Sequence, residues 1–353
     1  MEKRILISGN EALAEAAIQA GCQAYFGYPI TPQNEITAYM ARRMPEEGRV
    51  FLQAESELAA INMVFGAAVS GVRAMTTSSS PGISLMQEGL SYMAGAEVPC
   101  VVANIARGGP GLGNIAGSQS DYFQATKGGG HGDYNFIVLA PASVQEMADL
   151  TFDAFNLADE YRTPVIILAD GYLGQMMEPA AIKRRRIKRF KKDWALTGAS
   201  GREPNAIKSM YLAEGVLEKH NERLQRKFDR IKRELCLVRE YSIPDAEIIL
   251  VAYGTSSRMC RSVVRNLRKK NLKVGLIRPI TLWPFPSESI RRAASYAKFF
   301  LVVEMSAGQM IEDVRLAVEG RASIYFYGRM GGGIPEEEEI IKVIRKRFRL
   351  SEV

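Results

Sequence analysis

The stretch from Val50 to Ala106 reads VFLQAESELAAINMVFGAAVSGVRAMTTSSSPGISLMQEGLSYMAGAEVPCVVANIA. Its short apolar runs VFLQ, VRAMTT and PCVVANI predict strands, and the longer patterns between them predict helices near 55–70 and over 81–96. Strands that alternate with helices in this way form a parallel sheet with helices on both faces. The stretch therefore predicts an α/β fold.

The alternation continues on both sides of this stretch. Upstream, Asn10 is a suitable N-cap for a helix over EALAEAAIQA that stops at Gly21, and QAYFG then predicts a strand before a further helix, PQNEITAYMARRM. Downstream, FIVLAP and PVIILAD are continuous apolar runs, which are typical of strands covered on both faces. Residues 1–182 therefore predict one parallel-sheet domain.

Residues 183–244 interrupt the pattern. This segment begins with the basic run KRRRIKRFKK and leads through TGASGREPN into a long charged helix. Apolar side chains recur along that helix at spacings of four, three, four and three residues. Such a narrow stripe predicts packing along the body of the protein or on a partner. The stripe consists of Leu224, Phe228, Ile231, Leu235 and Val238. We interpret the segment as a basic connector with a long amphipathic helix.

Residues 245–353 return to alternating strands and helices. The runs EIILVAY, LKVGLIRP, KFFLVVE and ASIYFY predict strands. Between them lie helical patterns over roughly 255–270, 286–297 and 308–320, and a last helix follows Pro335. This part of the chain predicts a second, smaller α/β domain.

The positive charge of the chain is concentrated in one segment. The sequence has 46 Lys and Arg against 39 Asp and Glu, a net charge of +7. Residues 183–240 hold 18 of the bases and 8 of the acids, which leaves 28 against 31 elsewhere. The basic run is therefore either a solvated face or a docking site for an acidic partner. No apolar run approaches the ~20 residues that span a bilayer, so we expect a cytoplasmic protein that binds no membrane.

The cysteines are far apart in the sequence and form no CxxC pair. They are Cys22, Cys100, Cys236 and Cys260. This spacing argues against structural zinc or an iron–sulfur cluster held by this chain alone. We therefore expect scattered buried thiols and no metal ligands in this chain.

Two acids open the helix that follows VFLQ. Glu55 and Glu57 precede AAINMVFGAAVSG, whose side chains are almost all apolar and small. A carboxylate on the flank of such a helix is costly unless it is paired or used, although one of the two could simply favour the helix N-terminus. Three glycine-rich stretches, GYPITP, RGGPGLG and KGGGHGD, lie between predicted strands and helices, but none matches a P-loop or a clean dinucleotide motif.

Together these motifs resemble one known family. YPITP, the stretch from QAESELAAINMVFGAAVSG to SYMAGAEVPCVV, ARGGPGLG and ILADG are similar to the alpha subunit of 2-oxoacid:ferredoxin oxidoreductases. Within that family the chain looks closest to the 2-oxoisovalerate (3-methyl-2-oxobutanoate) type. The resemblance runs over nearly the whole chain. It implies that residues 1–182 are a thiamine-diphosphate pyrimidine-binding domain and residues 245–353 a transketolase C-terminal-like domain.

The resemblance also implies roles for single residues. The family's cofactor-activating glutamate falls on Glu57, with Glu55 as the nearby competitor. Thr31 in YPITP and Arg107 in ARGG match the positions that contact the 2-oxoacid. The implied cofactor-binding residues are Glu57, Tyr28 and Pro29. The loop 127–131, KGGGH, matches a glycine loop of the same subgroup, and no role is assigned to it.

The implied reaction explains these residue types. A carboxylate that is hydrogen-bonded to N1′ of the thiamine aminopyrimidine favours the tautomer whose 4′-nitrogen removes the C2 proton. An arginine beside the 2-oxoacid carboxylate gives charge-assisted orientation, and the Thr31 hydroxyl can hydrogen-bond the carboxylate or the oxo group. The expected reaction is oxidative decarboxylation of a 2-oxoacid to acyl-CoA and carbon dioxide, with electrons passed to ferredoxin.

The resemblance also implies partner subunits, and a motif that the sequence lacks agrees with it. Thiamine enzymes hold the diphosphate through a metal on a GDG motif, and no GDG occurs in this chain. The resemblance implies that the diphosphate, Mg²⁺ and an iron–sulfur cluster belong to a beta subunit, with small gamma and delta subunits beside it. The active site would lie between chains, so we expect this chain to be inactive alone.

Two other functions fit parts of the sequence. A transketolase- or decarboxylase-type thiamine enzyme would share the domains and use no ferredoxin, and its partner would lack redox cysteines. A non-enzymatic basic scaffold or nucleic-acid-binding protein would use residues 183–240 and would bind DNA or RNA in a salt-sensitive way. The second alternative leaves the acids and the glycine loops unexplained, and we expect no nucleic-acid partner.

Overall fold

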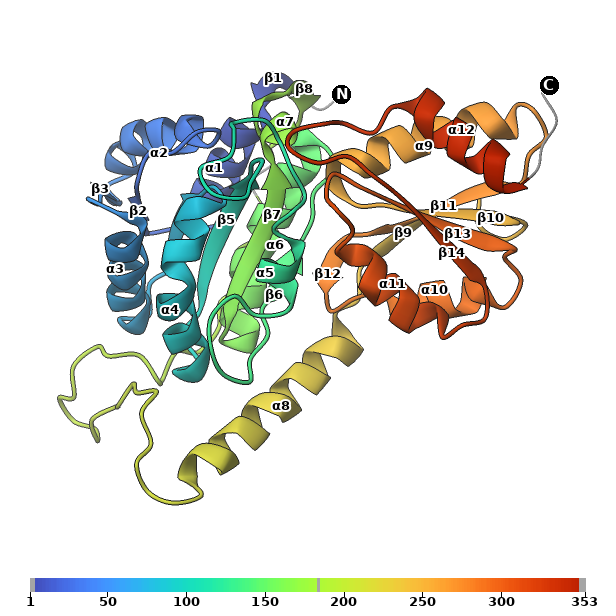
Figure 1. Cartoon of the computed structure of the whole chain (residues 1–353). Helices are drawn as coiled ribbons and strands as arrows, with labels where there is room; N and C mark the ends of the chain where they lie inside the picture. Colours follow the sequence, from blue (N-terminus) through green and yellow to red (C-terminus); the bar gives the residue numbers. More distant parts are fainter. Residues whose placement is uncertain (1–3, 183–184, 349–353) are drawn as a thin grey trace.

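Two mostly parallel β-sheets organise the chain in the computed structural model, which describes residues 4–182 and 185–348 (Figure 1). The first sheet has seven strands in the order β12-β6-β7-β5-β4-β2-β3, and β12 at its edge is antiparallel to β6. The strands are β2 (Ala24–Gly27), β3 (Val50–Gln53), β4 (Ala74–Ser78), β5 (Cys100–Ala106), β6 (Ile137–Leu139), β7 (Pro164–Asp170) and β12 (Thr281–Trp283). Every residue of β5 and β7 is buried, so the core lies along these central strands. The predicted α/β fold with a parallel sheet is confirmed.

The helices that accompany this sheet pack in two groups. The first of them, α1, contacts both α2 and α6, whereas α3 packs against α4. Pro81 occupies the first turn of α4, where its missing N–H costs no hydrogen bond. The helices are α1 (Gly9–Gln19), α2 (Asn34–Glu46), α3 (Glu57–Val69), α4 (Pro81–Gly95), α5 (Tyr122–Thr126), α6 (Val144–Tyr161) and α7 (Gly171–Gln175).

The start of α1 corrects one prediction. Ser8 is the N-cap: its hydroxyl oxygen accepts a hydrogen bond from Glu11 N at 3.2 Å, and Glu11 Oε2 accepts one from Ser8 N at 3.4 Å. This capping box satisfies two N–H groups that would otherwise lack partners. Asn10, which the sequence predicted as the cap, lies inside the helix and donates to Pro32 O at 2.8 Å. It therefore ties α1 to the loop that follows β2.

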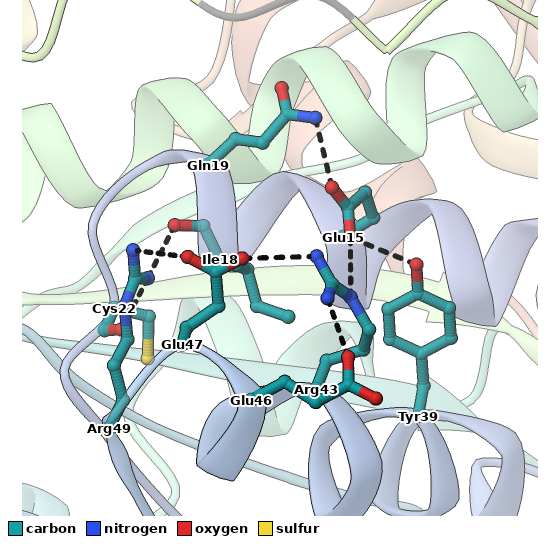
Figure 2. A network of polar contacts seen from close by, with 9 residues as sticks. All are labelled: Glu15, Ile18, Gln19, Cys22, Tyr39, Arg43, Glu46, Glu47 and Arg49. Carbon is teal, nitrogen blue, oxygen red and sulfur yellow. Dashed lines mark hydrogen bonds and ion pairs between the residues drawn. The ribbon is translucent and has the colours of Figure 1, made fainter.

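Figure 2 shows the polar contacts that join α1 to α2. Glu15 accepts hydrogen bonds from Tyr39 Oη at 2.9 Å and Gln19 Nε2 at 3.0 Å, and it lies 3.6 Å from Arg43 Nε. Burial, with Glu15 beside it, raises the pKa of Tyr39 to about 12, so this phenol stays protonated and donates. Arg49 donates to two carbonyls at and just after the end of α1, at 2.6 and 2.9 Å. These contacts hold α2, and with it the YPITP loop, in place.

The second sheet has five strands in the order β14-β13-β10-β11-β9, with β9 antiparallel to β11 at its edge. Its strands are β9 (Val238–Tyr241), β10 (Ile248–Val251), β11 (Val274–Pro279), β13 (Phe299–Glu304) and β14 (Ser323–Gly328). Its helices are α9 (Gly254–Arg268), α10 (Ser287–Ala294), α11 (Met310–Val318) and α12 (Glu337–Phe348). All of the strands and helices predicted for this part are present.

A separate antiparallel pair joins β1 (Ile5–Ser8) to β8 (Met177–Ala180).

The two sheets are fixed to each other. Strand β12 follows β11 in the chain but joins the first sheet, and the buried Gln119 lies between the sheets. Gln119 Oε1 accepts hydrogen bonds from Ser256 Oγ at 2.7 Å and Met305 N at 2.9 Å, and its Nε2 donates to Tyr253 O at 2.9 Å. Because a buried amide is costly unless it is paired, this arrangement favours one relative position of the sheets.

The connector helix α8 (Val216–Glu234) runs below both sheets in Figure 1. The first three members of the predicted apolar stripe, as far as Ile231, are buried against the main core, as expected. The helix ends earlier than the stripe implies: Leu235 lies just past its end, and Val238 begins β9. The stripe therefore packs along the body of the protein and continues into an edge strand.

Glu97, in the turn before β5, holds α8 to the first sheet. Its carboxylate pairs with Arg223, and with Lys227 at 3.2 Å, both on α8. Burial acts to raise the pKa of Glu97, but the charges of Lys227 and Arg223 outweigh burial and hold the pKa below its usual value. Because the pKa is lower in the folded chain than in the unfolded chain, ionised Glu97 stabilises the fold at neutral pH, and this stability is lost as the pH falls through the folded-state pKa.

Replacing Glu97 by glutamine should therefore destabilise the chain at pH 7 by about 1–3 kcal/mol, because the largely buried Lys227 loses its carboxylate partner and keeps only Arg162 O at 3.1 Å. At acidic pH, where Glu97 is protonated in both states, the difference from the original chain should shrink. Urea unfolding at pH 7 and at progressively lower pH measures both effects. Glu222→Gln removes an exposed pair with Arg226 at 3.8 Å and should cost less than about 1 kcal/mol. Equal costs for both variants at pH 7 would contradict the role of Glu97.

The described part of the basic run lies along α6 and forms neither helix nor strand. Arg185 pairs with Asp153 at 2.5 Å, and Lys192 pairs with Asp159 at 2.6 Å, both acids of α6. The first two residues of the run lie outside the described residues. Part of the run is thus neutralised within the chain, and docking of an acidic partner on its exposed remainder stays a prediction.

Candidate functional site

Glu57 is the first residue of α3 and is only 4% exposed. Ser56 caps the helix by accepting a hydrogen bond from Ala59 N at 3.2 Å, and a carboxylate at this end is favoured by the helix dipole. Ser78, the last residue of β4, donates its hydroxyl to Glu57 Oε1 at 3.0 Å. Within the described residues, Oε2 of Glu57 accepts no hydrogen bond. One carboxylate oxygen is therefore held in place, and the other is available.

Gly82 makes room for this carboxylate. A Cβ atom at Gly82 would lie 2.1 Å from Glu57 Oε1 and 2.0 Å from Ser78 Oγ, which is closer than side chains approach one another. The sequence analysis missed both Ser78 and Gly82. The sequence offered one weak signal, a glycine in the first turn of an otherwise well-formed helix.

The two acids that compete for the catalytic assignment differ in burial. Glu57 is buried, whereas Glu55 lies in the turn before α3 and is exposed. An exposed carboxylate is hydrated and needs no partner, whereas a buried one is costly unless a partner or ligand pairs with it. Burial therefore distinguishes the two acids, and the catalytic assignment of Glu57 stays a prediction.

The structure brings Arg107 and Thr31 together. Arg107 follows β5, is 8% exposed, and donates from Nη1 to Thr31 O at 2.9 Å and from Nη2 to Leu112 O at 3.1 Å. Its Nε is buried and has no hydrogen-bond partner in the described structure. The Thr31 hydroxyl accepts from Asn34 Nδ2 at 3.2 Å. Arg107 thus contacts the backbone of Thr31, and the hydroxyl keeps its own hydrogen to donate.

Glu57 and Arg107 are linked through the end of β4. Ser78 binds Glu57, and two residues later the hydroxyl oxygen of Ser80 accepts a hydrogen bond from Arg107 N at 3.0 Å. Both sites lie at the carboxyl ends of neighbouring parallel strands, β4 and β5. Ligands of open α/β sheets bind at this edge. The two sets of residues therefore belong to one region of the protein.

A polar network that the sequence analysis did not predict adjoins this region. Asp121 accepts hydrogen bonds from Ser80 Oγ at 2.6 Å and from Asn104 Nδ2 at 2.8 Å. Burial raises the pKa of Asp121 above its usual value, although both hydrogen bonds act to lower it. A cleft of about 400 Å³ opens beside Asp121, and Met305 from the end of β13 lines its far side. The cleft thus lies between the two sheets.

The other predicted site residues lie around this edge. Tyr28 and Pro29 are exposed in the loop after β2, and Tyr28 O accepts a hydrogen bond from Gln33 Nε2 at 3.0 Å. The loop 127–131 packs on α4, where Ser91 donates its hydroxyl to His131 O at 2.6 Å. Its first residue, Lys127, pairs with an acid of α11. This loop therefore has a packing role that the sequence did not reveal.

The described part of the chain offers no metal centre, because no three His, Cys, Asp or Glu side chains gather there. Three of the cysteines are buried, as expected, but Cys236 is exposed. The prediction that all four thiols are buried is therefore wrong for Cys236. This residue follows α8, a helix whose side chains are mostly exposed to solvent. Among the helices in residues 4–182 and 185–348, none has both the length and the apolar character required to cross a bilayer.

Two family models match the chain. Residues 15–237 match the thiamine-diphosphate-binding domain of pyruvate flavodoxin/ferredoxin oxidoreductases. Residues 246–340 match core domain II of pyruvate:ferredoxin oxidoreductase. The first match contains Glu57, Thr31 and Arg107, and the second covers most of the second sheet.

Two curated relatives match over nearly their whole length. The chain is 52% identical to ketoisovalerate oxidoreductase subunit VorB of Methanothermobacter marburgensis, over 97% of each chain. It is 38% identical to 2-oxoglutarate synthase subunit KorA of Methanothermobacter thermautotrophicus, over 99% of this chain and 100% of the relative.

Solved structures agree with these matches. The 2-oxoglutarate:ferredoxin oxidoreductase of Magnetococcus marinus, with 2-oxoglutarate, coenzyme A and succinyl-CoA bound, aligns with a TM-score of 0.89 and 28% identity. The alignment covers 98% of this chain and 65% of that one, so this chain spans about two thirds of the solved chain. A split-gene transketolase aligns with a TM-score of 0.61 at 13% identity, which shows the fold alone.

Proposed function

The chain belongs to the 2-oxoacid:ferredoxin oxidoreductase family, as a subunit with a thiamine-diphosphate-binding domain, and from this premise we propose its reaction and site. The reaction is the oxidative decarboxylation of a branched 2-oxoacid, of the 3-methyl-2-oxobutanoate kind, to acyl-CoA and carbon dioxide. Ferredoxin takes the electrons, and the enzyme works in the cytoplasm. The chain divides into a pyrimidine-binding domain (1–182), a connector (183–244) and a transketolase C-terminal-like domain (245–353).

The main support for the proposal is the buried carboxylate of Glu57. One of its oxygens accepts a hydrogen bond from Ser78, and the other accepts none within the described residues. Thiamine diphosphate, when bound, supplies the nucleophilic carbon and the electron sink for decarboxylation. The residues present fit its aminopyrimidine ring, because the free oxygen of Glu57 can accept a ring N–H while Ser78 holds the other oxygen. Tyr28 and Pro29 are exposed near the same sheet edge and would line the ring.

Arg107 and Thr31 would bind the carboxylate and oxo group of the substrate. A guanidinium carries five N–H donors, and Arg107 gives two of them to backbone carbonyls, which leaves donors for a carboxylate. Leu112 and Ile115, in the loop after Arg107, are exposed apolar side chains that suit a branched hydrocarbon tail. Since charge holds one end of the substrate and apolar contact the other, this region can orient a branched 2-oxoacid.

We propose that a beta subunit completes the site with the diphosphate-binding residues, Mg²⁺ and an iron–sulfur cluster, and that gamma and delta subunits join it. The absence of GDG from the sequence and of a metal-ligand cluster from the described residues supports this division. Leu58 on α3 and Leu85 on α4 are 45% and 53% exposed beside the Glu57 region. Exposed apolar side chains on two neighbouring helices suit a surface that a partner covers.

The preferred substrate tests this proposal in the assembled enzyme. We expect kcat/KM for 3-methyl-2-oxobutanoate to exceed that for pyruvate by at least about tenfold, because each added methylene in an apolar pocket contributes ~1–3 kcal/mol. The value for 2-oxoglutarate should be lower still, since its second carboxylate would meet apolar side chains. Ferredoxin reduction followed with each 2-oxoacid measures this order. A preference for pyruvate or 2-oxoglutarate would contradict the branched substrate while leaving family membership intact.

A further inference from the structure

A second cleft, of about 690 Å³, opens between α6 and β8 on one side and α9, β9 and β11 on the other. It lies beyond β6, near one edge of the first sheet, whereas Glu57 follows β3 at the opposite edge. None of its lining residues belongs to the site proposed above. Charged side chains dominate the lining: Arg239, Arg258, Arg261, Arg265, Arg278, Glu146, Glu178 and Glu337.

Part of this charge is paired inside the cleft. Arg278 donates to both carboxylate oxygens of Glu146, at 2.7 and 2.8 Å, and Arg258 pairs with Glu178 at 2.7 Å. Burial acts to raise the pKa of Glu146, but the hydrogen bonds and charge of Arg278 outweigh burial and hold the pKa below its usual value. Glu146 is therefore ionised at neutral pH, and the charge of Arg278 balances its negative charge.

Two arginines of the cleft have no carboxylate partner among the residues that the structure describes. Arg261 and Arg265 are exposed and four positions apart on α9, so both guanidinium groups lie on one face of the helix. Arg261 lies over the ring of Tyr241, 4.9 Å from its centre, and Arg265 donates to Ser262 Oγ at 3.4 Å. Like charges at this spacing destabilise a helix unless an anion lies between them. The cleft thus presents unbalanced positive charge.

We propose that this cleft binds the phosphate group of a small molecule, with Arg261 and Arg265 as its main contacts. Five arginines face three glutamates, which leaves two positive charges, and a phosphate monoester carries about −1.5 to −2 at neutral pH. Guanidinium groups bind phosphate through paired N–H donors, and the hydroxyl of Ser262 lies between the two arginines in sequence.

The position of the cleft gives such binding a consequence. Glu146 and Glu178 come from the part of the chain that builds the first sheet, whereas the free arginines lie on α9, which packs on the second sheet. A ligand that is bound by α9 and is large enough to cross the cleft would also contact the wall formed by α6 and β8. Binding should stabilise the relative position of the two sheets, and with it the cleft beside Asp121.

Isothermal titration calorimetry on the full chain tests the proposal with inorganic phosphate, pyrophosphate, ADP and coenzyme A as probes. We expect at least one probe to bind with a dissociation constant below about 1 mM at 50 mM salt, and more weakly at 500 mM salt. The order of affinities distinguishes free phosphate from a nucleotide or coenzyme A as the source. The double variant Arg261→Gln, Arg265→Gln should lower the affinity at least tenfold.

A matched control removes the same charge outside the cleft. Lys269 and Lys270, exposed at the end of α9, become glutamine in this variant, and the affinity should change by twofold at most. Because all four positions are on the surface, circular dichroism should show an unchanged fold in every variant. The proposal is overturned if no probe binds, if the arginine variant binds as tightly as the original chain, or if the lysine control loses as much. Binding that disappears in the assembled enzyme would also overturn it, since a partner chain would then occupy the cleft.

Discussion

Turnover by the assembled enzyme should fall at least about a hundredfold when Glu57 is replaced by glutamine, while the chain stays folded. Glutamine keeps the size of the side chain and can still accept the hydrogen bond from Ser78, which spans 3.0 Å in the original chain. It removes the negative charge that would stabilise a proton on the aminopyrimidine ring. Because general acid–base groups contribute about 10²–10⁴-fold in rate, the loss should appear in kcat more than in KM. Steady-state ferredoxin reduction measures it.

Two further variants separate the role of Glu57 from the effects of any nearby change. Glu55→Gln alters an exposed acid two residues away and should change kcat less than about threefold. Gly82→Ala keeps both glutamates in the sequence. Its methyl group would lie 2.1 Å from the position that Glu57 Oε1 occupies in the original chain, so the carboxylate must move. It should therefore lower kcat strongly. An unaffected Gly82→Ala enzyme would show that the position of the Glu57 carboxylate does not matter.

Replacing Arg107 by alanine should lower kcat/KM by about a hundredfold for every 2-oxoacid, branched or straight. Every such substrate carries the carboxylate that Arg107 is proposed to bind, and hydrogen bonds to a charged group contribute ~1.5–3 kcal/mol each. The ratio of kcat/KM between two substrates should therefore stay almost constant. Assays with 3-methyl-2-oxobutanoate and pyruvate in parallel measure both values and their ratio.

Arg107→Lys is the matched control for this variant. Lysine keeps the charge but loses the planar fork that reaches Thr31 O and Leu112 O in the structure, so activity should be partly restored. An unchanged kcat/KM in Arg107→Ala would refute the carboxylate-binding role. A loss confined to branched substrates would assign Arg107 to the tail of the substrate instead.

The sequence predicted the strands of both sheets well, because buried parallel strands are continuous apolar runs and β5 and β7 are of this kind. The sequence did not predict a short strand that depends on a distant partner, and it predicted the wrong residue as one helix cap. Strand β12 has three residues and depends on pairing with β6, far away in the sequence, which no periodicity reveals. The N-cap of α1 was placed at Asn10, although Ser8 with Glu11 three positions later is a recognisable capping box.

For the candidate site, sequence and structure contributed different parts. The resemblance pointed to Glu57, and burial now distinguishes it from Glu55, which sequence alone could not do. The sequence did not reveal Ser78 and Gly82, because their importance depends on their distances to Glu57. Ser78 ends β4, Gly82 lies in α4, and Glu57 begins α3. The cleft lined by Arg261 and Arg265 was not predicted for a similar reason, since its walls come from segments about a hundred residues apart. Contacts that form between distant segments leave no local pattern.

If Glu57 of this chain activates thiamine diphosphate, as we propose, the exchange of the cofactor's C2 proton with deuterium should depend on its carboxylate. The measurement uses the assembled enzyme with bound thiamine diphosphate and no 2-oxoacid, so substrate binding and electron transfer do not contribute. We predict exchange at least about a hundredfold slower in Glu57→Gln, and a rate in Glu55→Gln equal to that of the original enzyme. Normal exchange in Glu57→Gln with slow exchange in Glu55→Gln would reverse the assignment, and normal exchange in both would contradict the account.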